Sequence, residues 1–329
     1  MRMCIIFIRY LYLLLLYSFF LSFIYSNEKH VREILLAGDI LDPNNEISGM
    51  DWYQDQLFLL PENLNGYLFI IPKKKIDAFL SSDNPYPIKP KKINFKTPNY
   101  KTLIKGFDGF EAIEFNKDRI CISIEANYKN NMTSYIIWGT INPNTYEIKI
   151  EEENLKEIKT PIQIDNMAYE SIISIEQKVI LLYEANGLNL QKKVQHPTFS
   201  FDDFSIENID GFNIEYRITD ATKIDSNNKF WCINYFWPGD SQSLKPSKDS
   251  IFKKSRKGLT HQKSKVVERL IECKINANSI RISDNEPIQL VLDEKDSRNW
   301  EGIVRYNNDS FIIVTDKYPR MILGFVQNN

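Results

Sequence analysis

The sequence predicts an all-β protein, a β-propeller built from four-stranded antiparallel blades. Three observations support this fold class. One hairpin pattern occurs five times, the polar residues at its two ends keep a nearly constant spacing, and successive copies start 50 to 81 residues apart. Self-similarity at such intervals is typical of propeller blades, because each interval has room for the hairpin and two further strands.

The N-terminal segment differs from the rest of the chain. Arg2 and Arg9 flank the start of an almost wholly apolar run at 11–25. The run is short for a membrane-spanning helix, which needs about 20 residues, so we expect a signal peptide over 1–26, with cleavage after Ser26. The mature protein is then a secreted single propeller domain over 27–329. The alternative is a membrane-anchored protein with an uncleaved N-terminal segment.

Each hairpin begins with a small or acidic residue and ends with a polar one. The opening residues are Ser48, Glu111, Glu170, Asp220 and Glu301, and the closing residues are Glu62, Glu125, Glu184, Asn234 and Asp316. The spacing is 14 residues in the first four copies and 15 in the last, where the turn is longer. One such copy is an ordinary hairpin signal, but five copies with this spacing indicate a repeat.

The copies predict five blades. Segments rich in Ile, Phe and Tyr follow the hairpins and supply the outer strands, for example at 66–72 and 134–141. The chain after the last hairpin is too short for two outer strands. We therefore expect the strand at 32–40 to complete that blade, so that the N- and C-terminal strands pair and close the ring. A six-bladed ring, with a degenerate blade in the 81-residue interval, is the alternative.

If the first strand of each hairpin is innermost, the five opening residues converge on the axis and the closing residues lie near the same mouth. Crowded carboxylates repel one another, and a cation or protonation relieves that repulsion. Oxygen ligands in a loose ring favour Ca²⁺ over Mg²⁺, and zinc is disfavoured because His30, His196 and His261 have no ligand-like neighbours. Alternatively, the acids only accept hydrogen bonds at strand ends.

Composition excludes some partner classes. The formal net charge is −2, which gives no overall reason to expect nucleic acid. Beyond residue 26 only Cys121, Cys232 and Cys273 remain, too few for a disulfide framework. Cys121 is expected to be a buried thiol, while Cys232 and Cys273 are either bonded or two buried thiols. We expect a monomer that has no membrane contact after signal cleavage.

A basic insertion at 241–266 follows the second strand of the fourth hairpin. Its composition is typical of a disordered surface loop. Its place in the chain also fits a cationic flap over the acidic mouth, in which Lys253, Lys254 and Arg256 would bind a small anionic or phosphorylated substrate.

The ISG at Ser48, the glutamates at Glu111 and Glu170, and the WEGI at Glu301 resemble the secreted calcium-activated nucleotidases (apyrases), with Asp220 an approximate match. This resemblance implies five blades and an axial Ca²⁺. The NWEGI at Asn299, followed by a strand and Asp316, is similar to the esterase-like phytase propellers. This similarity is weaker, because Lys317 stands where that group has Asn.

Three functions are consistent with these observations. The first is a Ca²⁺-dependent hydrolase of phosphoesters or nucleoside phosphates, with Glu125 or Glu184 activating water. The second is a non-catalytic binding module with a structural axial cation. The third is a glycosidase, which needs two carboxylates with different pKa values, and the symmetry of the repeats speaks against it.

Overall fold

The computed structural model describes residues 28–62 and 66–328. Strands dominate this part of the chain, and each predicted hairpin forms. The hairpin strands are β2 (Ile47–Tyr53) with β3 (Gln56–Pro61), β6 (Phe107–Asn116) with β7 (Arg119–Tyr128), β11 (Tyr169–Ile175) with β12 (Lys178–Tyr183), β15 (Arg217–Ala221) with β16 (Lys229–Phe236), and β20 (Trp300–Asn307) with β21 (Ser310–Thr315).

Each hairpin continues outward into two further strands. These are β4 (Tyr67–Pro72) and β5 (Lys91–Lys96), β8 (Asn131–Ile141) and β9 (Ile148–Lys149), β13 (Gln195–Ser200) and β14 (Ile206–Asp210), β17 (Val267–Asn276) and β18 (Ser279–Ile282), and β22 (Leu323–Gln327) and β1 (Val31–Ile34). Two more strands, β10 (Leu155–Lys159) and β19 (Ile288–Gln289), pair with β8 and β17. We number the four-stranded groups one to five by their innermost strands β2, β6, β11, β15 and β20.

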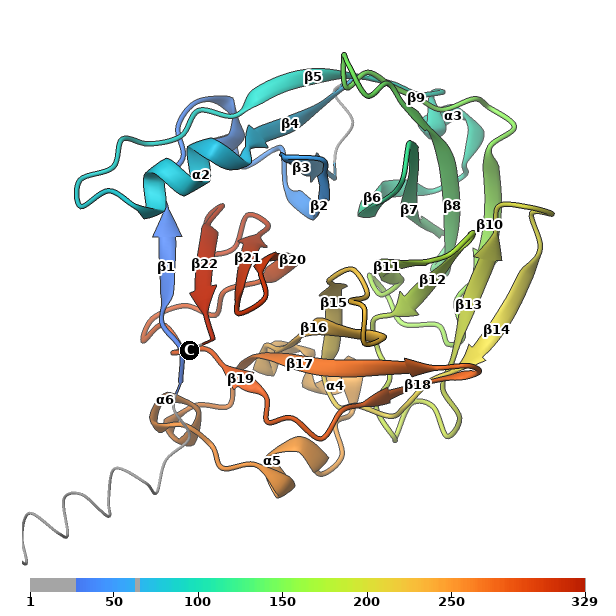
Figure 1. The fold of residues 1–329 in the computed structure, drawn as a ribbon. Coiled ribbons are helices and arrows are strands. Elements are labelled where there is room, and N and C mark those ends of the chain that lie inside the picture. The colour runs from blue at the N-terminus through green and yellow to red at the C-terminus, as the bar shows by residue number, and fades with distance from the viewer. Residues whose placement is uncertain (1–27, 63–65, 329) are drawn as a thin grey trace, which may run out of the picture.

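The groups form a propeller-like ring (Figure 1). The innermost strands contact one another in the order β2, β6, β11, β15, β20 and back to β2. At the outer edge, β5 pairs with β9 and β14 with β18, both in parallel. This joins groups one and two, and groups three and four, into nine-stranded sheets.

The apolar core is divided among the interfaces between neighbouring groups. Five clusters of buried side chains lie between groups one and two, two and three, three and four, four and five, and five and one. Strands such as β3, β12 and β21 are apolar on successive positions, so both faces of a group are buried, and stacked sheets bury such faces against each other. The axis is left to the polar residues of the innermost strands.

The N- and C-terminal strands pair as expected, with Val31 opposite Val326 and Ile34 opposite Leu323 in antiparallel register. The N-terminal segment also bonds to the groups on both sides. Lys29 forms a bridge with Leu290 beside group four, and Leu36 forms one with Ile88 of group one. We call residues 28–37 the clasp, because they connect groups four, five and one.

The remaining elements are short helices at the periphery. They are η1 (Asp39–Leu41), α2 (Lys73–Leu80), α3 (Tyr100–Leu103), η2 (Pro238–Asp240), α4 (Ser241–Leu244), α5 (Ser250–Lys254) and α6 (Leu259–Lys263). The predicted insertion at 241–266 is therefore largely helical, not an irregular loop. Its helices hold because Leu244, Ile251 and His261 are buried.

The cysteines within the described residues, Cys121, Cys232 and Cys273, are buried free thiols. The Sγ atoms of Cys232 and Cys273 lie 4.0 Å apart, about twice the length of a disulfide bond. Of the two alternatives for this pair, the structure contains two buried thiols.

Within the described residues, no helix has the length and apolar character needed to cross a bilayer. The predicted signal peptide over 1–26 lies outside the described residues, so signal cleavage and secretion stay predictions.

Candidate functional site: an acidic cavity on the ring axis

The innermost strands share an irregularity that points polar side chains toward the axis. In all five hairpins the pairing register shifts at the opening of the first strand. The shifts lie between Ile47 and Gly49, Phe110 and Ile113, Tyr169 and Ser171, Ile218 and Ala221, and Trp300 and Gly302. Such a β-bulge changes the direction of the unpaired side chain. The residues at the bulges include Ser48, Glu111, Glu170 and Glu301, which the sequence predicts to face the axis.

These residues line one cavity of 490 Å³. Seven sequence-predicted residues lie together on its walls: Ser48, Glu62, Glu111, Glu125, Glu170, Glu301 and Asp316. Seven others, which the sequence did not single out as site residues, complete the lining: Glu46, Asp108, Asn166, Arg217, Asn299, Lys317 and Tyr318. Hairpins far apart in the chain therefore bring eight carboxyl groups and two cations to one mouth. We call this space the acidic cavity.

The fourth group departs from the prediction. Asp220 does not line the acidic cavity, because its Oδ2 accepts a hydrogen bond of 2.7 Å from the backbone N–H of Ile303 on the next innermost strand. Thr219 takes the first position of this bulge, and its hydroxyl donates to the carbonyl of Trp300. Ser48 donates to the carbonyl of Phe110 in the same way. The constant spacing of 14 residues placed Asp220 at the opening position of this hairpin, whereas the adjacent Thr219 occupies it.

Two predicted closing residues, Asn234 and Glu184, do not line the cavity. Asn234 is fully buried, donates to the carbonyls of Glu215 and Arg217, and accepts from Nε of Arg269. The sequence places Asn234 with Glu62 and Asp316 among the residues expected to bind substrate, but Asn234 does not line the cavity, and its position gives that role no support. Glu184 is also fully buried and forms an ion pair with Arg217. Of the two predicted catalytic residues, only Glu125 lines the acidic cavity.

Arg217 is the main site residue that the sequence did not reveal. Its Nε donates to Glu184, and its two terminal nitrogens lie 3.4 Å from Oδ1 of Asn299 and Oε1 of Glu301. Burial alone would lower the pKa of Arg217, but the surrounding glutamates outweigh burial and raise it, so the side chain stays charged. The sequence does contain a signal: Glu46, Arg217 and Asn299 each stand two residues before the first bulge residue of their hairpin, and all three line the cavity.

Burial and mutual repulsion make the acidic cavity hold protons. Burial, then repulsion by Glu184, Asp108 and Glu62, raises the pKa of Glu125 to about 8. Burial, then the neighbouring Glu46, raises the pKa of Glu62 to about 8. At Glu184 the charge of Arg217 offsets much of the burial, and the pKa rises only to about 7. Carboxyl groups of one site thus differ in their protonation at neutral pH.

Asp316 lies in a more polar setting at the rim. Its Oδ1 accepts a 2.6 Å hydrogen bond from the backbone N–H of Tyr318, and its Oδ2 accepts one of 2.9 Å from Nδ2 of Asn299. Burial raises the pKa of Asp316, and both hydrogen bonds, with the charges of Arg217 and Lys317, oppose that rise.

One exposed aromatic ring lines the cavity rim, and a second precedes η2. Tyr318 lines the rim and is 60% exposed, and Trp237, 52% exposed, precedes η2. η2 ends at Asp240, whose pKa burial raises and the charge of Arg217 lowers. Exposed rings beside a polar cavity offer flat apolar surfaces to a ligand that also carries polar groups.

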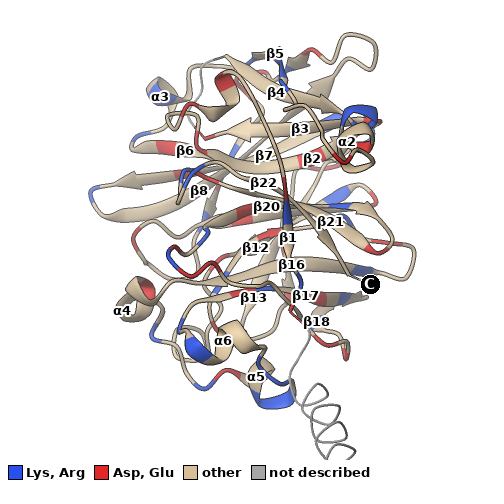
Figure 2. Ribbon diagram, turned by 90° about the vertical axis from the view of Figure 1, so that its left-hand side faces the viewer, with Lys and Arg blue, Asp and Glu red and all other residues tan. Residues whose placement is uncertain are grey.

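The basic insertion does not cover the acidic cavity. Lys253, Lys254 and Arg256 are not among the residues that line it. α5, which carries Lys253 and Lys254, lies outside the ring of innermost strands, next to β17 and β18 (Figure 1). Figure 2 shows the basic residues of α5 and α6 at one edge of the molecule. The structure therefore gives no support to the predicted substrate contacts of these three residues: α5 packs beside β17 and β18 of group four.

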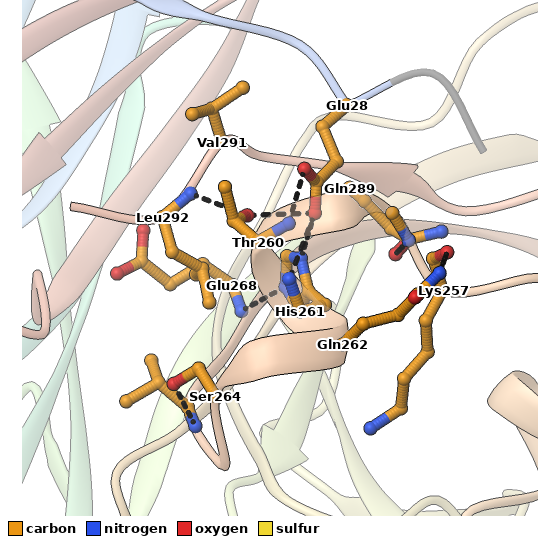
Figure 3. A network of polar contacts seen from close by, with 12 residues as sticks. Glu28, Lys257, Thr260, His261, Gln262, Ser264, Glu268, Gln289, Val291 and Leu292 are labelled. Atoms are coloured by element: carbon orange, nitrogen blue, oxygen red, sulfur yellow. Dashed lines mark hydrogen bonds and ion pairs between the residues drawn. The ribbon is translucent and has the colours of Figure 1, made fainter. Parts of the chain in front are cut away.

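α6 of the insertion binds the start of the clasp. The carboxylate of Glu28 accepts hydrogen bonds from the backbone N–H groups of Thr260 and His261, from the Thr260 hydroxyl and from Nδ1 of His261 (Figure 3). Nε2 of His261 accepts from the backbone N–H of Glu268. The observed role of this part of the insertion is to hold the N-terminal segment.

The predicted calcium site is not tested by the observed arrangement. Carboxylate and hydroxyl oxygens suit Ca²⁺ chemically. However, within residues 28–62 and 66–328 no three His, Cys, Asp or Glu side chains are arranged to hold a metal ion. The Ser48 hydroxyl is engaged by a backbone carbonyl, and Arg217 supplies a cation to the ring. Calcium stays a prediction from the sequence, and the function proposed for the cavity does not depend on it.

No family model and no curated protein match the sequence. Similar solved structures include the catalytic domain of a GH62 α-L-arabinofuranosidase from Coprinopsis cinerea, with 9% identity, coverage of 92% of this chain and 98% of that one, and a TM-score of 0.47. A mutant α-L-arabinanase from Cellvibrio cellulosa has 10% identity, coverage of 85% and 90%, and a TM-score of 0.46. The WD40 repeats of RRP9, with a TM-score of 0.36, and U3-55K, with a TM-score of 0.35, also match. Similarities this distant carry no argument about function.

These findings correct the resemblance drawn from the sequence. The similar structures named above are glycoside hydrolases, WD40 repeats and U3-55K, not calcium-activated nucleotidases or esterase-like phytases. The site itself disagrees with a phosphorylated substrate, because its two cations, Arg217 and Lys317, are already paired with glutamates and the basic insertion lies elsewhere. The resemblance rested on short motifs that the bulged hairpins share.

Proposed function

We propose that the acidic cavity is the active site of a glycoside hydrolase. One observation carries the proposal: carboxyl groups on the walls of a single cavity lie in unlike environments. Glycoside hydrolysis needs one carboxyl group that carries a proton and one that is ionised, on either side of the scissile bond. The symmetry of the repeats spoke against this function, and Arg217 from group four breaks that symmetry.

Glu125 is the proposed general acid. It is 3% exposed, lines the cavity, and has a pKa raised to about 8 by burial and by neighbouring carboxylates. It therefore carries a proton at neutral pH and can deliver it to the leaving-group oxygen.

Asp316 is the proposed ionised partner. Burial raises the pKa of Asp316, but two hydrogen bonds and the nearby charges of Arg217 and Lys317 oppose that rise and favour its charged form. In that form it can activate water or stabilise the positive charge that develops on the sugar ring. Tyr318, exposed on the same rim, offers a ring on which a sugar face can stack.

The proposal is tested by pairing variants with leaving groups. We expect Glu125→Gln to lower kcat about 100-fold or more on alkyl glycosides and far less on dinitrophenyl glycosides, whose leaving group needs no proton. Asp316→Asn should lower kcat on both substrates, because a good leaving group removes the need for a proton donor but not the need for the ionised carboxylate. The measurement is steady-state kinetics on a panel of alkyl and aryl glycosides.

Glu207→Gln is the matched control, since Glu207 is exposed and pairs with Lys178 away from the cavity. It should leave kcat unchanged. Equal losses on alkyl and dinitrophenyl glycosides for Glu125→Gln would remove Glu125 as the acid. Failure of the wild-type protein to cleave any glycoside of the panel would remove the proposed function.

We also propose that the five groups are the blades of a closed five-bladed propeller and that 27–329 is one domain. The cyclic contacts of the five innermost strands and the pairing of β1 with β22 support the count. Every long strand of the 81-residue interval belongs to group four, which speaks against a sixth blade. A crystal structure with six repeats around the axis would contradict it.

A further inference from the structure

The charge around the acidic cavity is unbalanced. Eight of its lining residues carry carboxyl groups, and the two cationic lining residues, Arg217 and Lys317, are engaged by other acids of the site. Lys317 forms a 2.7 Å ion pair with Glu46 at the rim, and Arg217 lies between Glu184 and Glu301. An anionic ligand would therefore find no unengaged cation among the described lining residues, while a cationic ligand would meet several carboxyl groups and would favour their ionised forms.

One carboxylate oxygen of the cavity wall is buried without a partner. Oε1 of Glu301 accepts from Asn299 and lies 3.4 Å from Arg217, whereas Oε2 of Glu301 has no hydrogen-bond partner. Glu301 is 6% exposed and lines the cavity. A buried polar atom without a hydrogen-bond partner destabilises the protein. A ligand that donates a hydrogen bond to this oxygen would therefore gain more binding free energy than from a hydrogen bond to a solvent-exposed oxygen.

The cation that the site already contains indicates what kind of donor fits. Arg217 donates N–H groups to the carboxylates of Glu184 and Glu301. Within the described residues, no three acidic, His or Cys side chains are arranged to hold a metal ion. An ammonium group likewise donates N–H bonds and does not require several oxygens at fixed short distances. The volume of 490 Å³ lies in the usual range of small-molecule sites, about 300 to 1000 Å³.

We propose that the acidic cavity selects sugars that bear a free primary ammonium group, and that Oε2 of Glu301 accepts a hydrogen bond from that group. That the ligand is a sugar rests on the proposed function. That it carries an ammonium group rests on the charge of the cavity and on the unpartnered oxygen of Glu301. N-acetylation of the amine removes the charge, and a uronic acid reverses it.

Binding to matched sugars tests the inference. For the purified protein we would measure, by titration calorimetry, the methyl glycosides of glucosamine, galactosamine and mannosamine beside their N-acetyl forms, with methyl glucuronide as the anionic probe. At least one amino sugar should bind about tenfold or more tightly than its N-acetyl form, and the advantage should shrink with added salt. Equal affinity within all three pairs, or tighter binding of the glucuronide, would overturn the inference.

Variants identify the group responsible. Glu301→Gln should abolish most of the amino-sugar advantage, whereas Glu207→Gln should retain it. If Glu301→Gln does not fold, Lys317→Met serves instead, because it leaves Glu46 without its cation and should increase the advantage. An advantage unchanged in Lys317→Met and in a folded Glu301→Gln would contradict the assignment.

Two further measurements separate the contribution of the amine from that of the sugar, and ammonium binding from catalysis. Methylamine that binds as tightly as the amino sugar would show that the sugar contributes nothing, which overturns the assignment to an amino sugar. Tight binding of the amino sugar without cleavage of any glycoside would refute the proposed function and leave the inference standing. Cleavage of neutral glycosides without any ammonium preference would do the reverse.

Discussion

Arg217 is the residue on which the charge balance of the cavity depends. It is the cation that contacts the fully buried Glu184, and it also reaches Glu301. Breaking a buried ion pair by removing one partner is much more costly than removing an exposed pair, because the remaining charge stays buried.

We expect Arg217→Met to reduce the free energy of unfolding by about 3–5 kcal/mol near pH 8. The loss should be smaller near pH 5, because Glu184 can then take up a proton and become neutral. Urea unfolding at the two pH values measures both numbers. Arg320→Met is the control: its pair with Glu33 is exposed, and its loss should stay below about 1 kcal/mol. Equal losses in the two variants would contradict the role of Arg217.

At the scale of residues, the sequence predicted which residues face the axis better than it predicted which groups they bind. Constant spacing located Ser48, Glu111, Glu170 and Glu301 because the bulge recurs at the same place in their hairpins. It failed at Asp220, where two polar residues are adjacent. Arg217 was missed because the repeat pattern consists of acids, and a counter-ion for a carboxylate ring need not repeat with the ring.

At the scale of elements, carboxylates connect neighbouring innermost strands. Asp51 accepts a 2.7 Å hydrogen bond from the backbone N–H of Phe115, and Glu114 accepts one of 3.1 Å from that of Ser174. Asp220 does the same for Ile303, at 2.7 Å. All three acids are buried. They satisfy backbone donors that no strand of the same group can reach.

We expect Asp220→Ala to reduce the free energy of unfolding by about 1–3 kcal/mol, because it leaves the N–H of Ile303 buried without an acceptor. Asp220→Asn keeps an acceptor oxygen and should lose less. Urea unfolding of both variants provides the comparison. A loss in Asp220→Asn as large as that in Asp220→Ala would show that the negative charge of Asp220, not the hydrogen bond, matters.

The short elements were the hardest to predict. The hairpins are marked by alternating apolar residues and polar turns, so their place in the chain was clear. The insertion at 241–266 has no periodic pattern, yet it forms α4, α5 and α6 through single buried side chains and the cap that Asp249 provides for α5. Tertiary packing outweighs composition there.

At the scale of the whole molecule, the clasp makes ring stability depend on pH through His261. Burial lowers the pKa of His261, with Glu28 opposing and Arg269 and Lys257 adding to the shift. The backbone N–H of Glu268 donates to its Nε2. His261 therefore binds a proton near pH 6.5 in the unfolded chain but only at lower pH in the folded protein. Its contribution to the free energy of unfolding falls as the pH drops below about 6.5.

Glu28 adds to this loss at lower pH. Burial would raise its pKa, but hydrogen bonds from Thr260 and His261 outweigh burial and lower it. Its contribution is present above pH 4.5, the ordinary value, and disappears as the pH falls through the folded value. We expect the clasp's contribution to the free energy of unfolding to decrease below about pH 6.5, so the stability of the wild type relative to His261→Gln should fall between about pH 6.5 and 5. The carboxyl groups of the acidic cavity have raised pKa values and act in the opposite direction in both proteins, because they add stability as the pH falls.

Urea unfolding across this pH series checks the prediction. The slope that remains in His261→Gln is the sum of two opposing contributions. His196, whose pKa burial lowers to about 4, and Glu28 lose stability as the pH falls, while the carboxyl groups of the acidic cavity gain it. A His261→Gln variant with the same slope as the wild type would show that the clasp does not sense protons.

The pairing of β1 with β22 has a consequence for biosynthesis. The first strand to be made has to wait for the last one, since Val31 and Val326 are partners across almost the full length of the chain. Groups one to four can assemble while the ribosome is still elongating, but the seam cannot form until β22 has left the ribosome. During that interval β1 has an unpaired edge, which makes the nascent chain dependent on protection against strand exchange with other copies.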